Sequence, residues 1–208
     1  MGKSDYYLEN VSPLLILGAQ RSGTTLLASM LGRHSEINML FESTSNEVFR
    51  LIGKKYQGNK LCLARQIDWE QRSNKFVFLA NRIINGHFFG DKYQVRRVGP
   101  TSRLSIKDYI QKKSKIVWIR RPDEEVINSM IRRTPMSQKQ AKAELKKVRL
   151  IETHLQDFLK VDYHDLTRNP NKVLRAVCEY LEIGFEEEML SGPEFNVIYP
   201  QKGIKITQ

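Results

Sequence analysis

The stretch Leu14-Leu15-Ile16-Leu17-Gly18-Ala19-Gln20-Arg21-Ser22-Gly23-Thr24-Thr25-Leu26-Leu27 decides the fold of this chain. Its apolar residues 14–17 predict a buried strand, and residues 25–33 predict the helix that follows. Two glycines five positions apart, Gly18 and Gly23, bracket the turn between them. Backbone N–H groups in such a turn converge on an anion at the helix N-terminus, where the helix dipole adds to the attraction. The stretch therefore predicts a phosphate-binding loop.

The loop departs from the nucleotide-binding pattern G-x-x-x-x-G-K-[ST] in the position of its cation. Thr24 stands where that pattern has lysine, and the cation lies inside the loop as Arg21. An arginine offers a planar, permanently charged fork that matches a phosphoryl or sulfuryl group. We therefore expect a nucleotide-phosphate site that differs from an ordinary ATP or GTP site. The candidate ligands of this first anion site are Gly18, Gln20, Arg21, Ser22, Gly23, Thr24 and Thr25.

The composition is ordinary for a soluble globular protein, except for an excess of cations. The chain has 208 residues, of which 40% are hydrophobic and 27% charged, and its formal net charge is +11. A chain of this length suits one domain, so we expect a single α/β domain over residues 1–208. The charge favours polyanionic ligands. The basic residues form no block and no aromatic-basic pattern, however, which argues against nucleic acid as the partner.

The sequence has no membrane-spanning run, no secretory signal core and no cysteine pattern for a metal. No apolar run approaches the roughly 20 residues needed to span a bilayer, and the N-terminus lacks the apolar core of a secretory signal. A cytoplasmic protein is the expectation. Cys62 and Cys178 lie too far apart to form a metal-ligand pattern or a disulfide framework. We expect Cys178 to be a small core residue.

The remainder of the chain repeats a pattern of strand, turn and helix, which favours a parallel sheet. We expect a P-loop-like three-layer sandwich, with a central parallel sheet flanked by helices. Further strands are predicted at residues 115–119 and 161–163. Helices are predicted at residues 46–56, 75–89, 104–113, 122–133 and 137–158, with a last one that begins at Asn169 or Asn171 and ends near Glu182.

A second anion site is predicted where the strand 115–119 ends. A Walker-type enzyme places a magnesium-binding Asp there, whereas this chain has Arg120-Arg121-Pro122. Two cations at that position repel Mg²⁺ and attract another phosphate. Ser129 and Arg133 are four residues apart on the next helix and share a face. Alternatively, Arg133 merely ends this helix favourably against its dipole.

Two anion sites in one sheet describe a nucleotide with phosphates at both ends, and here the chain resembles the PAPS-dependent sulfotransferases. Residues 18–27 look like their 5′-phosphosulfate loop. Residues 117–133 resemble their 3′-phosphate motif, an Arg at a strand end followed by Ser eight residues later. Arg121 and Ser129 satisfy that interval, and Arg120 is the alternative. The Thr24-Thr25 pair and residues 161–171 are closer to the tyrosylprotein and bacterial branches. The resemblance covers about half of the chain and is weak between residues 45 and 90.

The resemblance also implies catalytic roles. Arg21 would hold the transferred sulfuryl oxygens. Glu42, 21 residues further on, matches the catalytic glutamate of the tyrosylprotein branch, although Ser43 intervenes before the expected threonine. A carboxylate in reach of an acceptor hydroxyl can take its proton during the attack. The alternative is that Glu42 is an exposed loop acid or caps the next helix.

Two more residues are assigned in the same way. Lys92 resembles the lysine that stabilises the leaving phosphate, and the alternative is a turn lysine in solvent. His87 is a second candidate base, because phenol-type sulfotransferases use a histidine.

The expected function is transfer of a sulfuryl group from 3′-phosphoadenosine-5′-phosphosulfate (PAPS) to a hydroxyl or amine, with adenosine 3′,5′-bisphosphate (PAP) as product and no metal required. A carbohydrate, a phenol, a peptide tyrosine and an aminoglycoside fit about equally as acceptor. One alternative is a P-loop nucleotide or small-molecule kinase, for which Asp123 is the nearest magnesium ligand. Another is a non-catalytic nucleotide-binding module.

Overall fold

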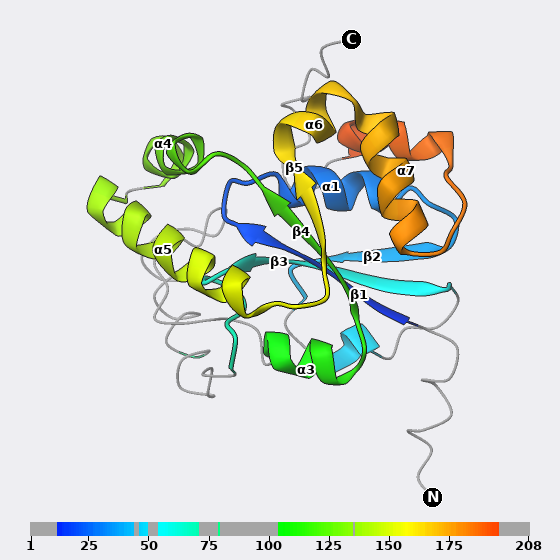
Figure 1. Ribbon diagram of the computed structural model, residues 1–208, viewed down its shortest axis with the longest axis horizontal. Helices are drawn as coiled ribbons and strands as arrows, with labels where there is room; N and C mark the ends of the chain where they lie inside the picture. The colour runs from blue at the N-terminus through cyan, green and yellow to red at the C-terminus, as the bar shows by residue number, and fades with distance from the viewer. Residues whose placement is uncertain are drawn as a thin grey trace, which may run out of the picture.

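The centre of the molecule is a parallel β-sheet. The computed structural model describes residues 12–43, 46–49, 54–70, 79, 104–134 and 136–195. In this part of the chain five strands pair in the order β2-β3-β1-β4-β5, and every pairing is parallel (Figure 1). The strands are β1 (Ser12–Ala19), β2 (Ile37–Phe41), β3 (Tyr56–Leu63), β4 (Lys115–Arg120) and β5 (Leu159–Asp162). The predicted α/β fold with a parallel sheet is confirmed.

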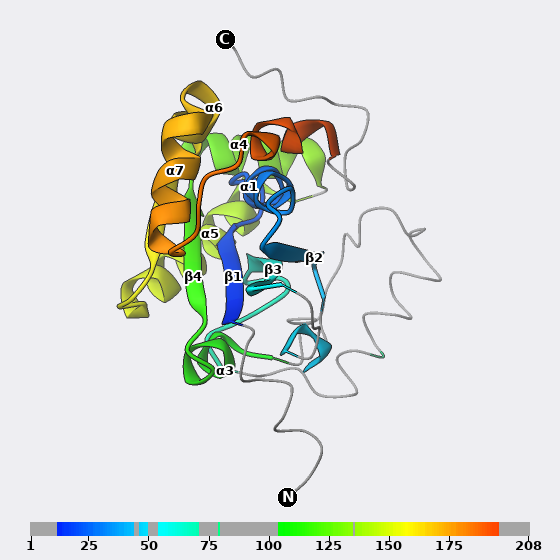
Figure 2. The ribbon, with the colours of Figure 1, turned by 90° about the vertical axis from the view of Figure 1, so that its right-hand side faces the viewer.

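Helices cover both faces of the sheet and complete three layers. One face carries α1 (Thr24–Leu31), α6 (Tyr163–Arg168) and α7 (Pro170–Tyr180), and the other carries α3 (Ile106–Gln111), α4 (Asp123–Arg133) and α5 (Gln138–His154). Short 3₁₀ helices lie at Asn46–Phe49 (η1) and Glu187–Phe195 (η2). Leu14 and Ile16 of β1 are buried under the first layer, and Leu15 and Leu17 under the second, as the two-residue period of a strand requires. Figure 2 shows β4 running from α3 at one end of the sheet to α4 at the other.

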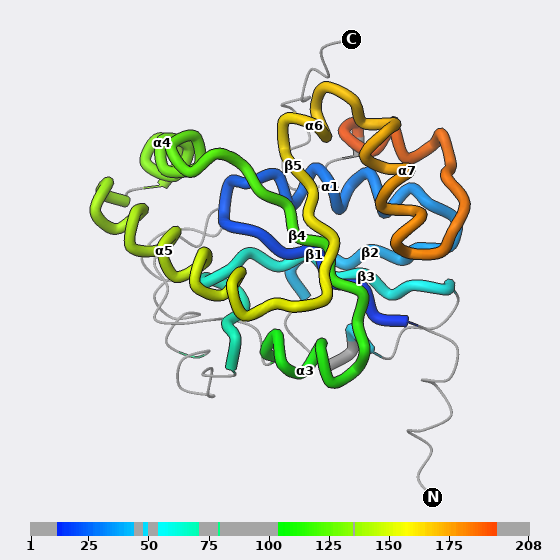
Figure 3. The backbone as a smooth tube through the Cα atoms, in the orientation of Figure 1, coloured from blue at the N-terminus to red at the C-terminus, as the bar shows by residue number. Residues whose placement is uncertain are grey.

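The connections of the two central strands diverge, and this positions the site. From β1 the chain passes through α1 to β2, which lies beyond β3, whereas from β4 it passes through α4 and α5 to β5 on the opposite side (Figure 3). β1 and β4 are direct neighbours, with Leu17 opposite Trp118. In open α/β sheets, ligands bind outside the carboxyl ends of strands at such a point. The glycine loop follows β1, and β4 ends at Arg120 with Arg121 next in the chain, so both predicted anion sites lie at this edge.

The predicted helix at residues 46–56 is wrong at its C-terminal end. Residues 46–49 form the short 3₁₀ helix η1, residues 50–53 lie outside the described residues, and the chain enters β3 at Tyr56. β3 does not have the apolar pattern by which a buried strand is predicted, because it contains Gln57, Asn59 and Lys60. All three of these polar side chains are buried. The Asn59 amide donates to the Tyr109 hydroxyl at 2.9 Å, so its burial depends on a partner 50 residues away. Neither β2 nor β3 was predicted.

Several element boundaries also differ from the predictions. β5 ends at Asp162, because its carboxylate accepts hydrogen bonds from the backbone N–H groups of His164 and Asp165 and so caps α6, which was not predicted. The long helix ends at His154 instead of residue 158. The last helix ends at Tyr180 instead of near Glu182. The predicted helix at residues 75–89 lies outside the described residues, apart from Leu79.

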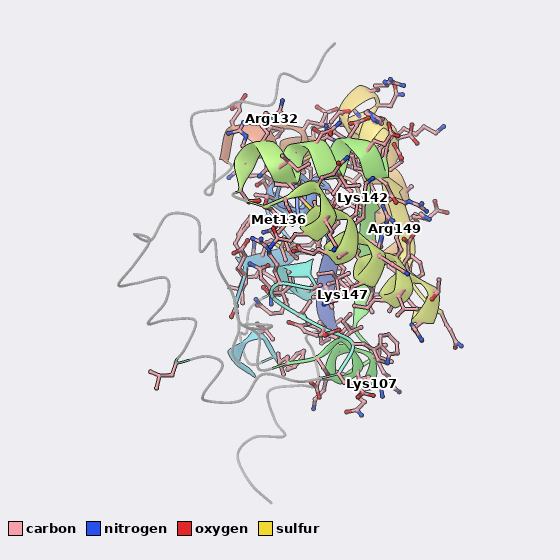
Figure 4. The ribbon with its side chains drawn as sticks, turned by 90° about the vertical axis from the view of Figure 1, so that its left-hand side faces the viewer. Lys107, Arg132, Met136, Lys142, Lys147 and Arg149 are labelled. Atoms are coloured by element: carbon pink, nitrogen blue, oxygen red, sulfur yellow. The ribbon has the colours of Figure 1, made fainter. Side chains whose placement is uncertain are left out.

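The lysines of α5 form a solvent-exposed face. Lys142 and Lys147 are exposed (Figure 4), as are Lys139 and Lys146, while Leu145 and Val148 on the other side are buried. Cys178 is buried beside Met189, and burial raises the pKa of its thiol to about 11. Within the described residues, no helix is both long and apolar enough to cross a membrane.

Candidate functional site

The loop between β1 and α1 has the backbone of a tight anion-binding turn. Gly23, at the N-cap of α1, has φ +102°, and Arg21 also has a positive φ of 71°. The Ser22 hydroxyl donates to the Ala19 carbonyl at 2.7 Å, so it builds the turn. A Cβ on Gly18 would lie 2.7 Å from the Ile119 carbonyl oxygen, so only glycine fits between the loop and β4.

The side chains around this loop are mostly buried. The Thr24 hydroxyl lies 3.6 Å from the Cys62 sulfur at the end of β3, and Thr25 is half-buried. The Gln20 side-chain oxygen is buried and has no hydrogen-bond partner among the described residues. A buried acceptor without a partner is costly, so a donor from a bound molecule would stabilise it.

The two predicted anion sites adjoin one another. Arg21 Nε donates to the Ser129 hydroxyl at 3.2 Å, which joins the loop after β1 to α4 after β4. Ser129 is buried, and Arg21 is partly exposed. This hydrogen bond connects the glycine loop to the middle of α4.

The three candidate arginines of the second site lie in different surroundings. Arg121 is close to the loop: its guanidinium carbon lies 4.4 Å from the centre of the Tyr163 ring, and that ring packs on Gly23 so closely that a Cβ there would lie 2.5 Å from it. Arg120 turns to the α5 side and forms an ion pair with Glu152 at 3.7 Å. Arg133 is exposed in the last turn of α4. Arg121 is thus the one stacked beside the loop.

Glu42 lies at the same edge of the sheet, directly after β2. Its φ is +61°, and its backbone N–H donates to the Lys60 carbonyl at 2.9 Å. Its carboxylate accepts from Lys60 Nζ at 2.5 Å, and the same ammonium lies 3.8 Å from the Cys62 sulfur. Lys60 is 1% exposed and Glu42 36%, so a buried cation holds a carboxylate that faces solvent. The candidate base is connected to Thr24 of the loop through Lys60 and Cys62.

Sequence reasoning missed Lys60, Tyr163 and Glu125. Lys60 was hidden because its strand was not predicted, although the run Leu61-Cys62-Leu63 behind it is a short strand signal. Tyr163 is the last residue of the strand predicted at residues 161–163, and its aromatic ring there was a usable signal. Glu125, in the first turn of α4, accepts a hydrogen bond at 2.8 Å from Nε of Arg121, four residues before it. His87 and Lys92 lie outside the described residues.

Asp123, the nearest magnesium ligand if the chain were a kinase, already pairs with an arginine. Arg149 donates to the Asp123 carboxylate through Nε at 3.0 Å and also through a terminal nitrogen. Within the described residues, no group of three or more His, Cys, Asp or Glu side chains is arranged to hold a metal ion.

Comparison with known proteins gives a family match over residues 13–97 and a similar fold. The family model described as "Sulfotransferase family" matches residues 13–97, which include the glycine loop, Glu42 and Lys60. Among solved structures, mouse sulfotransferase SULT7A1 complexed with PAP is similar with a TM-score of 0.56 at 15% identity, over 93% of this chain and 67% of that chain. That likeness is one of fold. No curated protein matches the chain.

Two further structures have TM-scores of 0.47. One is the sulfotransferase domain from the curacin biosynthetic pathway, at 14% identity over 88% of this chain and 78% of that one. The other is the sulfotransferase domain from the Synechococcus PCC 7002 olefin synthase, at 16% identity over 99% of this chain and 90% of that one. The family match is to the family as a whole and not to a branch within it. Residues 13–97 of this chain thus match the model of the sulfotransferase family, and its fold is like that of a solved sulfotransferase.

Proposed function

We propose that this chain transfers a sulfuryl group from PAPS to a hydroxyl or amine of its acceptor. The proposal is supported by the contacts that join the glycine loop to the end of β4. Arg21 of the loop hydrogen-bonds Ser129 of α4, and Arg121 stacks on the Tyr163 ring that packs against Gly23. Glu42 follows β2, on the opposite side of β1 from β4. Two cation-bearing anion positions suit a nucleotide that is charged at both its 5′ and 3′ ends. The solved relative complexed with PAP supports this choice of nucleotide.

In this proposal the donor lies across the diverging connections. The loop N–H groups, Arg21, Thr24 and Thr25 hold its 5′-phosphosulfate. Arg121 and Ser129 hold its 3′-phosphate, with Arg133 further along α4. PAPS supplies a sulfuryl group on a good leaving phosphate. Lys92 remains the proposed cation for the leaving oxygen.

On the acceptor side, Glu42 is the proposed general base. The acceptor oxygen forms a bond to sulfur, the bond from sulfur to the leaving phosphate oxygen breaks, and the hydroxyl proton passes to the Glu42 carboxylate. Lys60 positions this carboxylate, because its buried ammonium donates to one carboxylate oxygen. His87 is the alternative base. Arg21 lies where it can stabilise charge that develops during transfer.

Calorimetric titration with PAP tests the donor site. We expect micromolar binding that falls at least about 100-fold in Arg121→Ala, because a bidentate charged contact is lost. Arg132→Ala is the matched control, since Arg132 is an exposed arginine in the last turn of α4, the helix that follows Arg121. Binding of Mg-ATP should be much weaker. Equal or tighter binding of Mg-ATP would overturn the proposal in favour of a kinase.

The acceptor requires a separate experiment. Sulfur-labelled PAPS is incubated with the protein and a cell extract, and the labelled product is isolated and identified. A small-molecule, carbohydrate or peptide product assigns the acceptor class directly. Phosphate transfer from labelled ATP under the same conditions would indicate the kinase instead.

A further inference from the structure

A set of contacts around Arg121 goes beyond what anion binding alone requires. Arg121 Nε donates to one oxygen of Glu125 at 2.8 Å, and its guanidinium lies over the Tyr163 ring. Neither contact uses the two terminal NH₂ groups of Arg121, which are the donors of a bidentate contact to phosphate. The two contacts restrict the orientation of the guanidinium and leave these donors for an anion.

The second oxygen of Glu125 is held from another element. His164 Nε2 lies 2.8 Å from Glu125 Oε1, so the carboxylate bridges α4 and α6. His164 follows Tyr163, and the Asp162 carboxylate holds its backbone N–H at 2.7 Å. Arg121, Glu125, Tyr163 and His164 therefore form one connected cluster beside Gly23, and we call it the Arg121 cluster.

A carboxylate so near a phosphate site would by itself oppose the binding of an anion. Its presence is favourable only if the orientation that it gives to Arg121 outweighs the repulsion. The hydrogen bond from Arg121, followed by the one from His164, lowers the pKa of the Glu125 carboxyl. Glu125 is 37% exposed, so solvent screens part of both the attraction and the repulsion.

The imidazole adds a charge that changes with pH. A neutral His164 can still donate from Nε2 to Glu125, whereas a protonated one also adds a positive charge to the cluster. Two other charged groups, Glu125 and Arg121, face His164 from the α4 side. The remaining charged groups lie on or beside α6 and are Asp162, Asp165 and Arg168. With His164 protonated, the Arg121 cluster has a net positive charge and attracts an anion more strongly.

We propose that Glu125 and His164 are positioning residues for Arg121, and that the nucleotide's 3′-phosphate binds more tightly when His164 is protonated. The inference rests on the proposed function, since it assumes that Arg121 receives that phosphate. Glu125 acts by orientation through Arg121, and His164 acts by holding Glu125 and by its charge.

Calorimetric titration with PAP at pH 6 and pH 8 tests both parts. Glu125→Gln is expected to weaken binding by about tenfold, although it removes a negative charge, because the guanidinium loses its charged anchor. Glu124→Gln is the matched control: it removes the same charge from an exposed neighbour on α4 and should not weaken binding. Thermal melts of both variants establish that they are folded.

His164→Gln keeps a donor in place of Nε2 but cannot be protonated. At pH 8 it should bind PAP as the wild type does, and at pH 6 it should bind about threefold more weakly than the wild type. The phosphate's own ionisation near pH 6 affects every protein alike, so variants are compared at the same pH.

The outcomes separate the two claims. Glu125→Gln binding as tightly as the wild type, or more tightly, overturns the positioning role. His164→Gln matching the wild type at both pH values overturns the role of the imidazole charge. A wild type that binds no PAP overturns the proposed function and this inference with it, whereas tight wild-type binding with unaffected variants overturns the inference alone.

Discussion

At the scale of single residues, the site depends on a buried lysine that holds an exposed acid. Lys60 is 1% exposed and donates to Glu42 at 2.5 Å. A lysine is rarely buried so deeply without a charged partner. The ion pair therefore serves both the stability of the sheet edge and the orientation of the candidate base.

Replacing Glu42 should separate catalysis from binding. Glu42→Gln is expected to lower the rate of sulfuryl transfer by about 10²- to 10³-fold, because an amide cannot take the acceptor proton. The dissociation constant for PAP should stay unchanged. The free energy of unfolding should fall by about 1–3 kcal/mol, because Lys60 loses its carboxylate partner. Transfer assays, calorimetry and urea titration measure the three quantities, and an unchanged transfer rate would refute the assignment of Glu42 as the base.

Gly23 gives a second prediction at this scale. Gly23→Ala should destabilise the fold by about 1–3 kcal/mol and abolish PAP binding, because φ is +102° and the added Cβ would lie 2.5 Å from the Tyr163 ring. Gly184→Ala is the control, because a Cβ there meets no atom within 4 Å. Urea denaturation and PAP titration compare the two. Equal stability of both variants would contradict the described loop.

At the scale of elements, prediction succeeded where local signals sufficed. β1, the glycine loop, β4 and α4 all follow from apolar runs and from the glycines and Pro122 beside them. β3 failed because its side chains at Gln57, Asn59 and Lys60 are buried through partners that only tertiary structure supplies. Glu42 was identified as a candidate base through the family resemblance. Its partner Lys60 was not identified, because it lies in the strand β3 that was not predicted.

The long helix α5 offers a local test of stability. The Ser137 hydroxyl accepts from the Gln140 N–H, and the Gln140 side chain accepts from the Ser137 N–H, which together make a capping box. Ser137→Ala should lower the free energy of unfolding by about 1 kcal/mol. Lys142→Ala, on the exposed face of the same helix, should change it by less than about 0.5 kcal/mol. Urea titrations compare the two, and an equal effect would argue against the capping box.

At the scale of the whole molecule, the free energy of unfolding should fall at acidic pH. The pKa values of Glu125, Glu152 and Glu186 are lowered from the usual 4.5. Burial acts to raise the pKa of Glu152, but hydrogen bonds from Lys160 and Arg149 outweigh it. Below the usual value the unfolded chain binds more protons than the folded one, so stability rises with pH there. The stabilisation is present above about pH 5 and is lost as the pH falls through the lowered native values.

Urea titrations between pH 3 and pH 7 test this dependence. The wild type should lose stability steadily below pH 5. Glu152→Gln should be less stable by about 1–3 kcal/mol at pH 7, and its deficit should shrink with acid, because the wild-type carboxyl is then protonated too. A deficit that stays constant with pH would show that the Glu152 charge contributes nothing.

The arrangement of the whole site lies beyond local sequence patterns. Arg21 and Ser129 are 108 residues apart in the chain, and only the order of the strands brings them together. Two arginine-bearing motifs indicated a nucleotide with two charged ends. The two motifs adjoin because β1 and β4 are neighbours in the sheet and their connections diverge, which follows from the topology and not from either motif.

The transfer of labelled sulfuryl groups from PAPS into extract components tests most directly whether this chain is a PAPS-dependent sulfotransferase. The wild type should transfer label into a defined product, and Glu42→Gln should transfer about 10²-fold less while it binds PAP equally well. A wild type that binds PAP and transfers no label, or equal transfer by both proteins, would contradict the account.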